Sequence, residues 1–244
     1  MDNLETKILG SIALAPYIQV STALIGKARR IGGNQFRHNW ATVGILIDHK
    51  ILEPIILKAG VIHDLKEDAI YDYHPEQIRL IDEDGNRVVE LVEELSIGYE
   101  EKKIDYLKRV MQTGSKEAKI IKLADRISNL IDIQLGIFDI AKIKQTLNET
   151  REYILPFARD INENMYLEMV DLVNSRNKYM QQTIKTIANG LLTKIKEIAL
   201  DNEIIEEQNT TNPPKSNEEY NAAFKRIELE LTSDFFIHSV YKDI

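Results

Sequence analysis

Apolar residues recur at helical spacing along most of the chain. Residues 86–95 carry one apolar stripe, and residues 120–130 carry a denser one, with Ser115 placed before it as a helix N-cap. Residues 51–64 (ILEPIILKAGVIHD) are apolar, and Pro54 stands where it can start a helix. There is no convincing alternation of period two, and the chain has only 11 glycines. The pattern therefore predicts an all-α protein.

The composition changes near residue 200. Residues 172–200 have the pattern of a long helix, whereas residues 201–219 are polar, contain paired prolines and lack periodicity. A short helix is expected at 220–231. The predicted organisation is a domain over 1–200, a linker over 201–219 and a C-terminal helical segment over 220–244.

The net charge and the cysteine content limit the kinds of function that the chain can have. A chain of 244 residues with 43% hydrophobic content can bury a substantial core. Its formal net charge of -8 disfavours a general nucleic-acid binder, so an anionic substrate would need a local cationic patch or a metal ion. The absence of cysteine excludes disulfides, zinc ribbons and thiol nucleophiles, and it fits a reducing cytoplasm. We expect neither a signal peptide nor a membrane span.

His63 and Asp64 end the apolar run 51–64. An imidazole beside a carboxylate suits Mn, Fe, Co or Zn, although the ordinary explanation is a capping aspartate next to a packed histidine. Glu67 and Asp68 follow four residues later, so one further helical turn would place all four polar groups together. Such a group at the end of a buried helix is costly unless a cation or water compensates it.

Asp125 is a second candidate, because it lies inside the apolar stripe of KIIKLADRISNL. Asn129 shares its helix face at i+4. A carboxylate among core positions needs a partner. Lys122 or Arg126 would be a structural partner, and a metal ion shared with the histidine of the earlier pair would be a functional one.

His38 lies in ARRIGGNQFRHNW, the most basic short stretch of an acidic chain. Arg29, Arg30 and Arg37 could grip phosphates, and the glycines at 32–33 would let a ligand approach the backbone. The structural alternative is a turn with surface arginines. The other histidines lack such neighbours and are interpreted as structural or exposed: His49, His74 and His238.

In this order, the motifs resemble the ppGpp hydrolase domain of the RelA/SpoT proteins, a branch of the HD superfamily, and especially its stand-alone form, the small alarmone hydrolases. The family's R-K-x-G motif and following metal-ligating histidine are similar to residues 29–32 and His38. Its HDxxED motif matches GVIHDLKEDA at 60–69, and K-L-A-D-R-x-x-N matches 122–129. A further similar segment is ETREYILPFA at 149–158.

The resemblance implies an all-α HD-domain bundle with a C-terminal helical appendage, and it implies one divalent metal, usually Mn²⁺. The implied metal ligands are His38, His63, Asp64 and Asp125. Glu67 and Asp68 would orient or activate the attacking water. Arg29 and Arg30 would contact the nucleotide or its phosphates, and Asn129 the sugar or base.

The family reaction is hydrolysis of the 3′-diphosphate of ppGpp or pppGpp, which gives GDP or GTP and pyrophosphate. Several pocket positions depart from the family: Ile31, Asn34, Gln35, Asn39 and Asp132. An adenine alarmone such as ppApp, or a nucleoside monophosphate, is therefore an alternative substrate, and a catalytically silent HD-like regulatory module is an alternative class. Because few residues follow the linker, we expect hydrolysis without synthesis.

Overall fold

The computed structural model describes residues 4, 7, 12–133 and 139–209, with side chains described as far as residue 197. Within these ranges the chain is helical apart from its loops and one isolated antiparallel bridge between Ala28 and Asn34. The prediction of an all-α protein is confirmed. The chain divides into two units, Met1–Asn177 and Lys178–Ile244, and the first contains every candidate site residue.

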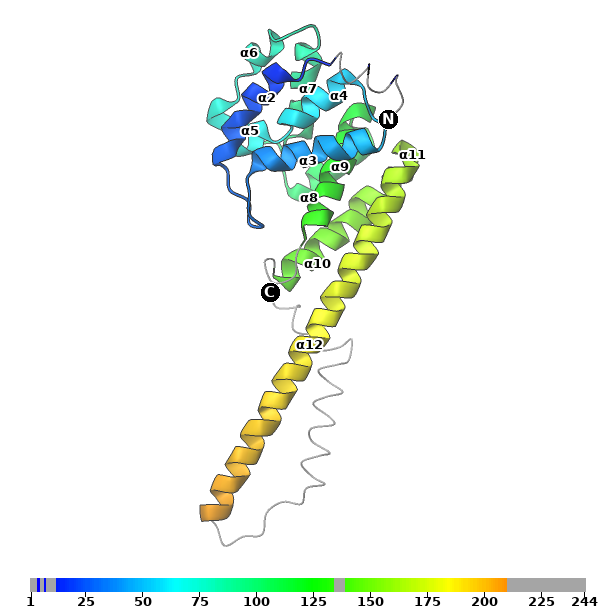
Figure 1. Cartoon of the computed structure of the whole chain (residues 1–244). Helices are drawn as coiled ribbons and strands as arrows, with labels where there is room; N and C mark the ends of the chain where they lie inside the picture. Colours follow the sequence, from blue (N-terminus) through cyan, green and yellow to red (C-terminus); the bar gives the residue numbers. More distant parts are fainter. Residues whose placement is uncertain (1–3, 5–6, 8–11, 134–138, 210–244) are drawn as a thin grey trace. The chain divides into compact units, whose positions relative to one another are not determined.

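Short helices of seven residues or fewer alternate with longer ones in the first unit (Figure 1). In chain order the elements are α2 (Ala15–Ser21), η1 (Thr22–Gly26), α3 (Gln35–Asp48), α4 (Pro54–Ile62), α5 (Leu65–Asp68), η2 (Ile70–Asp72), α6 (Pro75–Arg79), α7 (Gly85–Leu95), α8 (Lys103–Lys108), η3 (Arg109–Thr113), α9 (Lys116–Asp132), α10 (Ile140–Glu149), η4 (Thr150–Ile154), α11 (Leu155–Ile161) and α12 (Glu163–Asn209).

The α4 helix forms the centre of the first unit. Pro54 occupies the first turn, as the sequence predicted, and every residue from 56 to 62 is buried. Helix α4 packs against α2, α3, α7 and α9. A helix that is apolar on all sides is expected to be surrounded in this way.

A glycine lets α3 and α4 approach closely. A Cβ atom built on Gly60 would lie 3.2 Å from Leu46 Cδ1 and 3.4 Å from Val43 Cγ2, both on α3. Gly60 lies two residues before the end of α4 and about one turn before His63, so the close approach occurs next to His63. A larger side chain here would push apart the helices that carry two of the candidate ligands.

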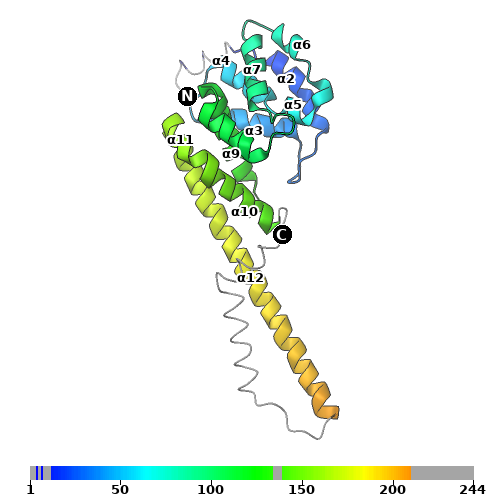
Figure 2. The ribbon, with the colours of Figure 1, turned by 180° about the vertical axis from the view of Figure 1, so that it is seen from behind.

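The α9 helix begins at the predicted cap. The side chain of Ser115 accepts a hydrogen bond from the amide of Ala118, and the Ser115 hydroxyl in turn donates to Glu94 at 2.7 Å. Helix α9 packs against α3, α4 and α7, and α3 and α9 lie against each other in both views (Figure 1 and Figure 2). Three polar side chains of α9 are buried: Asp125, Arg126 and Ser128. They identify the helix face that meets the functional site.

The α12 helix confirms the long helix expected over 172–200, but it extends to Asn209, past residue 201 where the linker was expected to begin. The polar run after Leu200 is rich in Glu and Gln, which favour helix, and the helix-breaking prolines come later. The boundary between the two units falls after Asn177, within α12. The remaining linker and the segment 220–244 lie outside the described residues and stay predictions.

Two contacts fix the first part of α12 within the first unit. Arg176 donates hydrogen bonds to the backbone carbonyls of Leu130 and Ile131 at 2.9 and 2.8 Å. His49, at the end of α3, pairs with Glu168 at 2.6 Å. These contacts explain why the unit continues to Asn177.

In the described part of the chain, no helix has both the length and the apolar character that are needed to cross a bilayer.

A buried lysine connects α4 to the loop before α7. Lys58 donates to Asp82 at 2.8 Å and to Asp84 at 2.7 Å, and Tyr17 donates to Asp82 at 2.8 Å. Lys58 is 5% exposed and Tyr17 is fully buried. Burial alone would raise the pKa of Asp82, but Lys58 and Tyr17 hold it below its usual value. The carboxylate therefore compensates a buried ammonium group.

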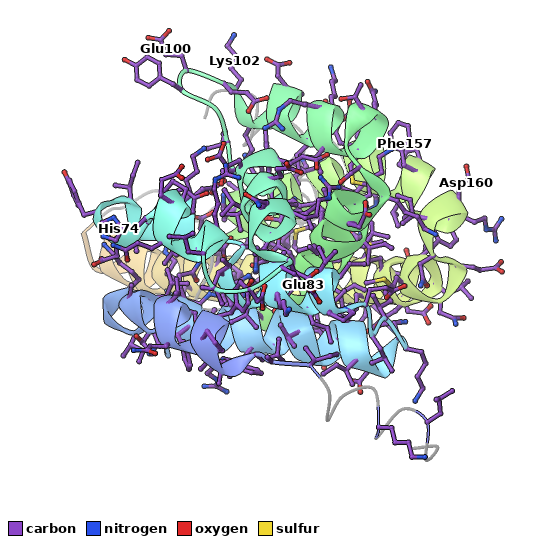
Figure 3. The ribbon with its side chains drawn as sticks, turned by 90° about the horizontal axis from the view of Figure 1, so that it is seen from above. His74, Glu83, Glu100, Lys102, Phe157 and Asp160 are labelled. Carbon is purple, nitrogen blue, oxygen red and sulfur yellow. The ribbon has the colours of Figure 1, made fainter. Side chains whose placement is uncertain are left out.

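We predict that Asp82→Asn lowers the free energy of unfolding by about 2 kcal/mol, because the Lys58 ammonium loses a charged partner. Urea unfolding measures the change. Glu83→Gln is the matched control, since Glu83 is the exposed neighbour labelled in Figure 3 and also loses one negative charge. Its expected effect is within about 0.5 kcal/mol. Equal effects in the two variants would contradict a specific role for Asp82.

Candidate metal centre and adjoining cavity

Three buried side chains from three helices meet at one point. They are His38 from α3, His63 from the C-terminal end of α4 and Asp125 from α9. Their potential ligand atoms all lie within 4.8 Å of one another. The packing of α3, α4 and α9 therefore brings together residues that are far apart in the sequence.

The distances define a common focus for these groups. Asp125 Oδ1 lies 3.0 Å from His38 Nε2 and 3.9 Å from His63 Nε2. Asp64 lies at the same place, with one oxygen 3.3 Å from His63 Nε2 and the other 3.6 Å from His38 Nε2. The Asp64 side chain is 19% exposed, so it forms the open side of an otherwise buried cluster. All four predicted ligands are thus near neighbours.

Both imidazoles are oriented by hydrogen bonds at Nδ1, the ring nitrogen on the outer side of the cluster. His63 Nδ1 donates to the carbonyl of Gly60 at 2.9 Å, and His38 Nδ1 pairs with the Ser128 hydroxyl at 3.1 Å. Each ring therefore presents Nε2 to the cluster. His63 Nε2 is buried and has no hydrogen-bond partner in the described part of the chain. When one ring nitrogen of a histidine ligates a metal, the other nitrogen usually forms a hydrogen bond of this kind.

Asp125 is kept ionised despite its burial. Burial would raise its pKa, but the Lys122 ammonium and the two imidazoles hold the pKa of Asp125 well below its usual range. Lys122 donates to Asp125 Oδ2 at 2.7 Å, which leaves Oδ1 facing the imidazoles. The structural partner considered for Asp125 is therefore present, and it occupies the oxygen that points away from the imidazoles.

The carboxylates of the cluster act on the pKa of His63. Burial lowers its pKa, but the carboxylates of Asp64 and Asp125 outweigh this effect and raise the pKa to about 9. The cluster thus has a strong electrostatic preference for a positive charge at its centre.

The residues present fit a divalent metal ion. Two imidazole nitrogens with carboxylate oxygens form a donor set that suits Mn, Fe, Co or Zn. His63 Nε2 is buried without a hydrogen bond, and the atoms that face it are carboxylate oxygens of Asp64 and Asp125 at 3.3 and 3.9 Å, an arrangement that a metal ion would complete. Of the described residues, His38, His63 and Asp125 would hold such an ion, with Asp64 at its open side.

Glu67 and Asp68 lie on α5, directly after the cluster. Gln35 donates to Asp64 Oδ2 at 3.1 Å and to Asp68 Oδ2 at 2.6 Å, so one amide connects a candidate ligand to the acid pair. Glu67 accepts a hydrogen bond from the amide of Ile97 at 2.7 Å. Partial burial raises the pKa of both carboxyl groups.

The predicted substrate residues fall into two groups. Arg29 donates to Asp132 at 2.5 Å and to Asn129 at 3.0 Å, so its guanidinium is held against α9. Asn129 also donates to Asp125 at 2.6 Å, as expected from their i, i+4 spacing. Arg30, in contrast, is exposed at the turn that follows. Arg29 and Asn129 therefore already have partners within the protein.

Gly32 and Gly33 shape this turn through their backbone angles. Their φ values are 90° and 72°, which side chains with a Cβ rarely adopt. A Cβ on Gly32 would meet no atom within 4 Å. The positive φ angles therefore explain why glycine occupies both positions.

A cavity of about 600 Å³ adjoins the cluster. Gln35 and Asn129 line it and also donate to the candidate ligands Asp64 and Asp125, so the two sites are continuous. Six lining side chains are cationic, against the single carboxylate of Asp68. The cationic side chains are Lys27, Arg29, Arg30, Lys103, Arg126 and Lys142. The local cationic patch that an acidic chain would need for an anionic substrate is therefore present.

The sequence did not predict several side chains that surround the cluster and the cavity. Gln35 was noted only as a departure from the family, and Ser128, Lys103 and Lys142 were not singled out. Ser128 lies three residues after Asp125, so helical spacing could have indicated it. Lys103 and Lys142 come from segments whose proximity depends on tertiary packing alone.

Two of the remaining histidines are paired or exposed, as expected. His49 is paired with Glu168, and His74 is exposed at the edge of the bundle (Figure 3). His238 lies outside the described residues.

No protein-family model and no curated protein sequence matches the chain. A solved structure does match: a metazoan ortholog of SpoT, described as hydrolysing ppGpp and acting in starvation responses. The two are 21% identical with a TM-score of 0.59, and the match covers 67% of this chain and 94% of the other. The chain therefore shares the all-α fold of that structure, as the resemblance implied.

We predict that the purified protein binds about one Mn²⁺ ion per chain and that His63→Ala weakens this binding more than about 100-fold, because a ligand is lost. Isothermal titration calorimetry of the metal-free protein measures both quantities. His74→Ala is the control, because that imidazole is exposed and away from the cluster. Unchanged affinity in His63→Ala would show that the ion binds elsewhere.

Proposed function

We propose that the chain is a metal-dependent phosphohydrolase that removes the 3′-diphosphate of ppGpp or pppGpp, with release of GDP or GTP and pyrophosphate. The observation that carries the proposal is the convergence of His38, His63 and Asp125 in one buried cluster, with Asp64 at its open side, beside a cationic cavity. The fold shared with a metazoan ppGpp hydrolase supports the choice of substrate.

The proposed ligands of a single Mn²⁺ ion are His38, His63, Asp64 and Asp125. When bound, the metal would lower the pKa of a water molecule and polarise a phosphoryl oxygen. The protein supplies the orientation, because Gly60 and Ser128 fix the two imidazoles through their outer nitrogens.

Glu67 is the proposed general base, and Asp68 assists in orienting the water. The amide of Ile97 holds Glu67 Oε1, which leaves Oε2 as the atom that would take the proton. Partial burial raises the pKa of Glu67, and a base whose pKa approaches the working pH is better suited to proton transfer. Gln35 donates to both Asp68 and Asp64, so it positions Asp68 relative to one of the proposed ligands.

The cationic cavity would receive the rest of the nucleotide. A bis-diphosphate carries several negative charges. Of the six cationic side chains, Arg29 pairs with Asp132, and Lys103 and Arg126 share Glu149. The proposed cations for the phosphates are therefore Lys27, Arg30 and Lys142. Arg30 is the proposed contact for the departing phosphates, since it lines the cavity and is exposed.

Other functions are separated by direct assay. A panel of ppGpp, pppGpp, ppApp and nucleoside monophosphates, with Mn²⁺ present, distinguishes the substrates of HD hydrolases. A catalytically silent regulatory module would release neither pyrophosphate nor phosphate from any of them. The complete acid pair beside the cluster favours the enzyme. As part of the proposal, the protein acts in the cytoplasm on a small nucleotide, without nucleic-acid or membrane partners.

We predict that Glu67→Gln lowers kcat for ppGpp by about 100-fold or more, because the proton acceptor is lost while the metal ligands remain. Pyrophosphate release measures the rate, and calorimetry should show unchanged Mn²⁺ affinity. Full activity in the variant would remove Glu67 from the mechanism, and loss of Mn²⁺ would reassign it as a ligand.

We also predict that Lys142→Gln raises KM for ppGpp on the order of 10-fold, because the cavity loses a charged hydrogen-bond donor. Lys144→Gln is a matched control on the same helix, since Lys144 does not line the cavity. Steady-state kinetics should give a change below about twofold for the control. Equal changes in the two variants would indicate a general charge effect rather than a contact in the cavity.

A further inference from the structure

The side chain of Arg29 is held at both ends of its guanidinium. One terminal nitrogen donates to Asp132 Oδ2 at 2.5 Å and the other donates to Asn129 Oδ1 at 3.0 Å. Asn129 and Asp132 lie one turn apart at the end of α9, so the planar guanidinium spans both side chains. The Arg29 side chain is 16% exposed, so its partners are protein groups rather than water.

This contact determines the orientation of the Asn129 amide. Because the amide oxygen accepts from Arg29, the amide nitrogen points the other way and donates to Asp125 Oδ1 at 2.6 Å. If the amide turned over, its oxygen would face the carboxylate, and two acceptors would oppose each other. Arg29 thus selects the orientation in which Asn129 stabilises Asp125.

Asp125 is held from two sides as a result. Asn129 donates to Oδ1, which faces the imidazole of His38 at 3.0 Å, and Lys122 donates to Oδ2. A carboxylate fixed at both oxygens presents one defined lone-pair direction to the cluster. Loss of either donor would let the Asp125 side chain rotate away from the position at which it meets the imidazoles.

The turn that carries Arg29 is itself ordered by the backbone. Arg29 donates its amide hydrogen to the carbonyl of Gly33 at 3.1 Å, and the amide of Gln35 donates to the carbonyl of Lys27 at 2.9 Å. The turn therefore connects the two halves of the site, since Arg29 reaches α9 and Gln35 reaches Asp64.

We propose that Arg29 is a positioning residue for Asp125, that it acts through Asn129, and that Asp132 is the carboxylate that keeps Arg29 in this role. The inference rests on the proposed metal centre. It differs from the role implied by the resemblance, in which Arg29 and Asn129 contact the nucleotide. Contact with the departing phosphates is then left to Arg30.

The test compares Arg29→Gln with Arg30→Gln, adjacent variants of the same turn that lose the same charge. Calorimetry on the metal-free full chain gives the Kd for Mn²⁺, and kinetics with ppGpp give kcat and KM. We expect Arg29→Gln to weaken Mn²⁺ binding about 10- to 100-fold, the range found when a group supporting a metal ligand is lost. Arg30→Gln should leave the Kd for Mn²⁺ unchanged and raise KM.

Asp132→Asn tests the anchoring carboxylate. This variant should weaken Mn²⁺ binding, as Arg29→Gln does. Combining the two substitutions should have little further effect, because both break the same series of contacts from Asp132 through Arg29 to Asn129. Arg29→Lys keeps the charge but cannot span two partners, so it should also weaken binding. This variant serves if Arg29→Gln does not fold, which circular dichroism would reveal.

Two results would overturn the inference without affecting the proposed function. One is an Arg29→Gln protein with wild-type Mn²⁺ affinity and a raised KM, which would make Arg29 a substrate ligand. The other is an Asp132→Asn protein with unchanged Mn²⁺ affinity and a lowered KM, which would make Asp132 a shield over a phosphate-binding arginine. A wild-type chain that binds no Mn²⁺ would overturn both proposals together.

Discussion

The rest of the site depends on the burial of the Asp125 carboxylate between two imidazoles. Removing a charge from water costs several kcal/mol, so such a group persists only where its partners are fixed in place. Here the partners come from α3, α4 and α9, which pack against one another, and Gly60 lets α3 and α4 approach closely. The apolar contacts of these helices therefore stabilise the fold and also set the geometry of a charged cluster.

The same constraint organises the surroundings of the cluster. Lys122, Asn129 and Ser128 all project from α9 toward the cluster, where they stabilise Asp125 or orient His38. On the other side Gln35 connects Asp64 to Asp68. The cluster is thus surrounded by side chains whose hydrogen bonds leave the inward atoms, above all His63 Nε2, directed at one point.

The distribution of charge has a functional meaning. The chain carries a net charge of -8, yet the cavity beside the cluster is lined by six cationic groups and one carboxylate. This contrast favours an anionic small molecule that is bound at one place over a polyanion that is bound across the surface. The proposed metal centre and the cationic cavity lie side by side, joined by Gln35 and Asn129, which line the cavity and donate to Asp64 and Asp125.

Local features could be predicted from the sequence because they depend on neighbours in the chain. Pro54 starts α4, Ser115 caps α9, and Asn129 meets Asp125 at helical spacing, as expected. The convergence of the four proposed ligands was implied by resemblance to a family, because spacing alone cannot bring α3, α4 and α9 together.

Features that depend on tertiary contacts could not be predicted. The pairing of Arg29 with Asp132 joins a turn to a helix end a hundred residues away, and the cavity cations Lys103 and Lys142 come from separate helices. The composition change near residue 200 indicated a linker too early, because Glu and Gln are polar and also favour helix.

Anomalous diffraction at the manganese absorption edge, from crystals grown with Mn²⁺, tests the central claim most directly. The account predicts one peak per chain at coordination distance, about 2.0–2.3 Å, from Nε2 of both His38 and His63 and from a carboxylate oxygen of Asp125. A peak at another place, or occupied crystals in which His63 Nε2 is bonded to a protein group instead, would contradict it.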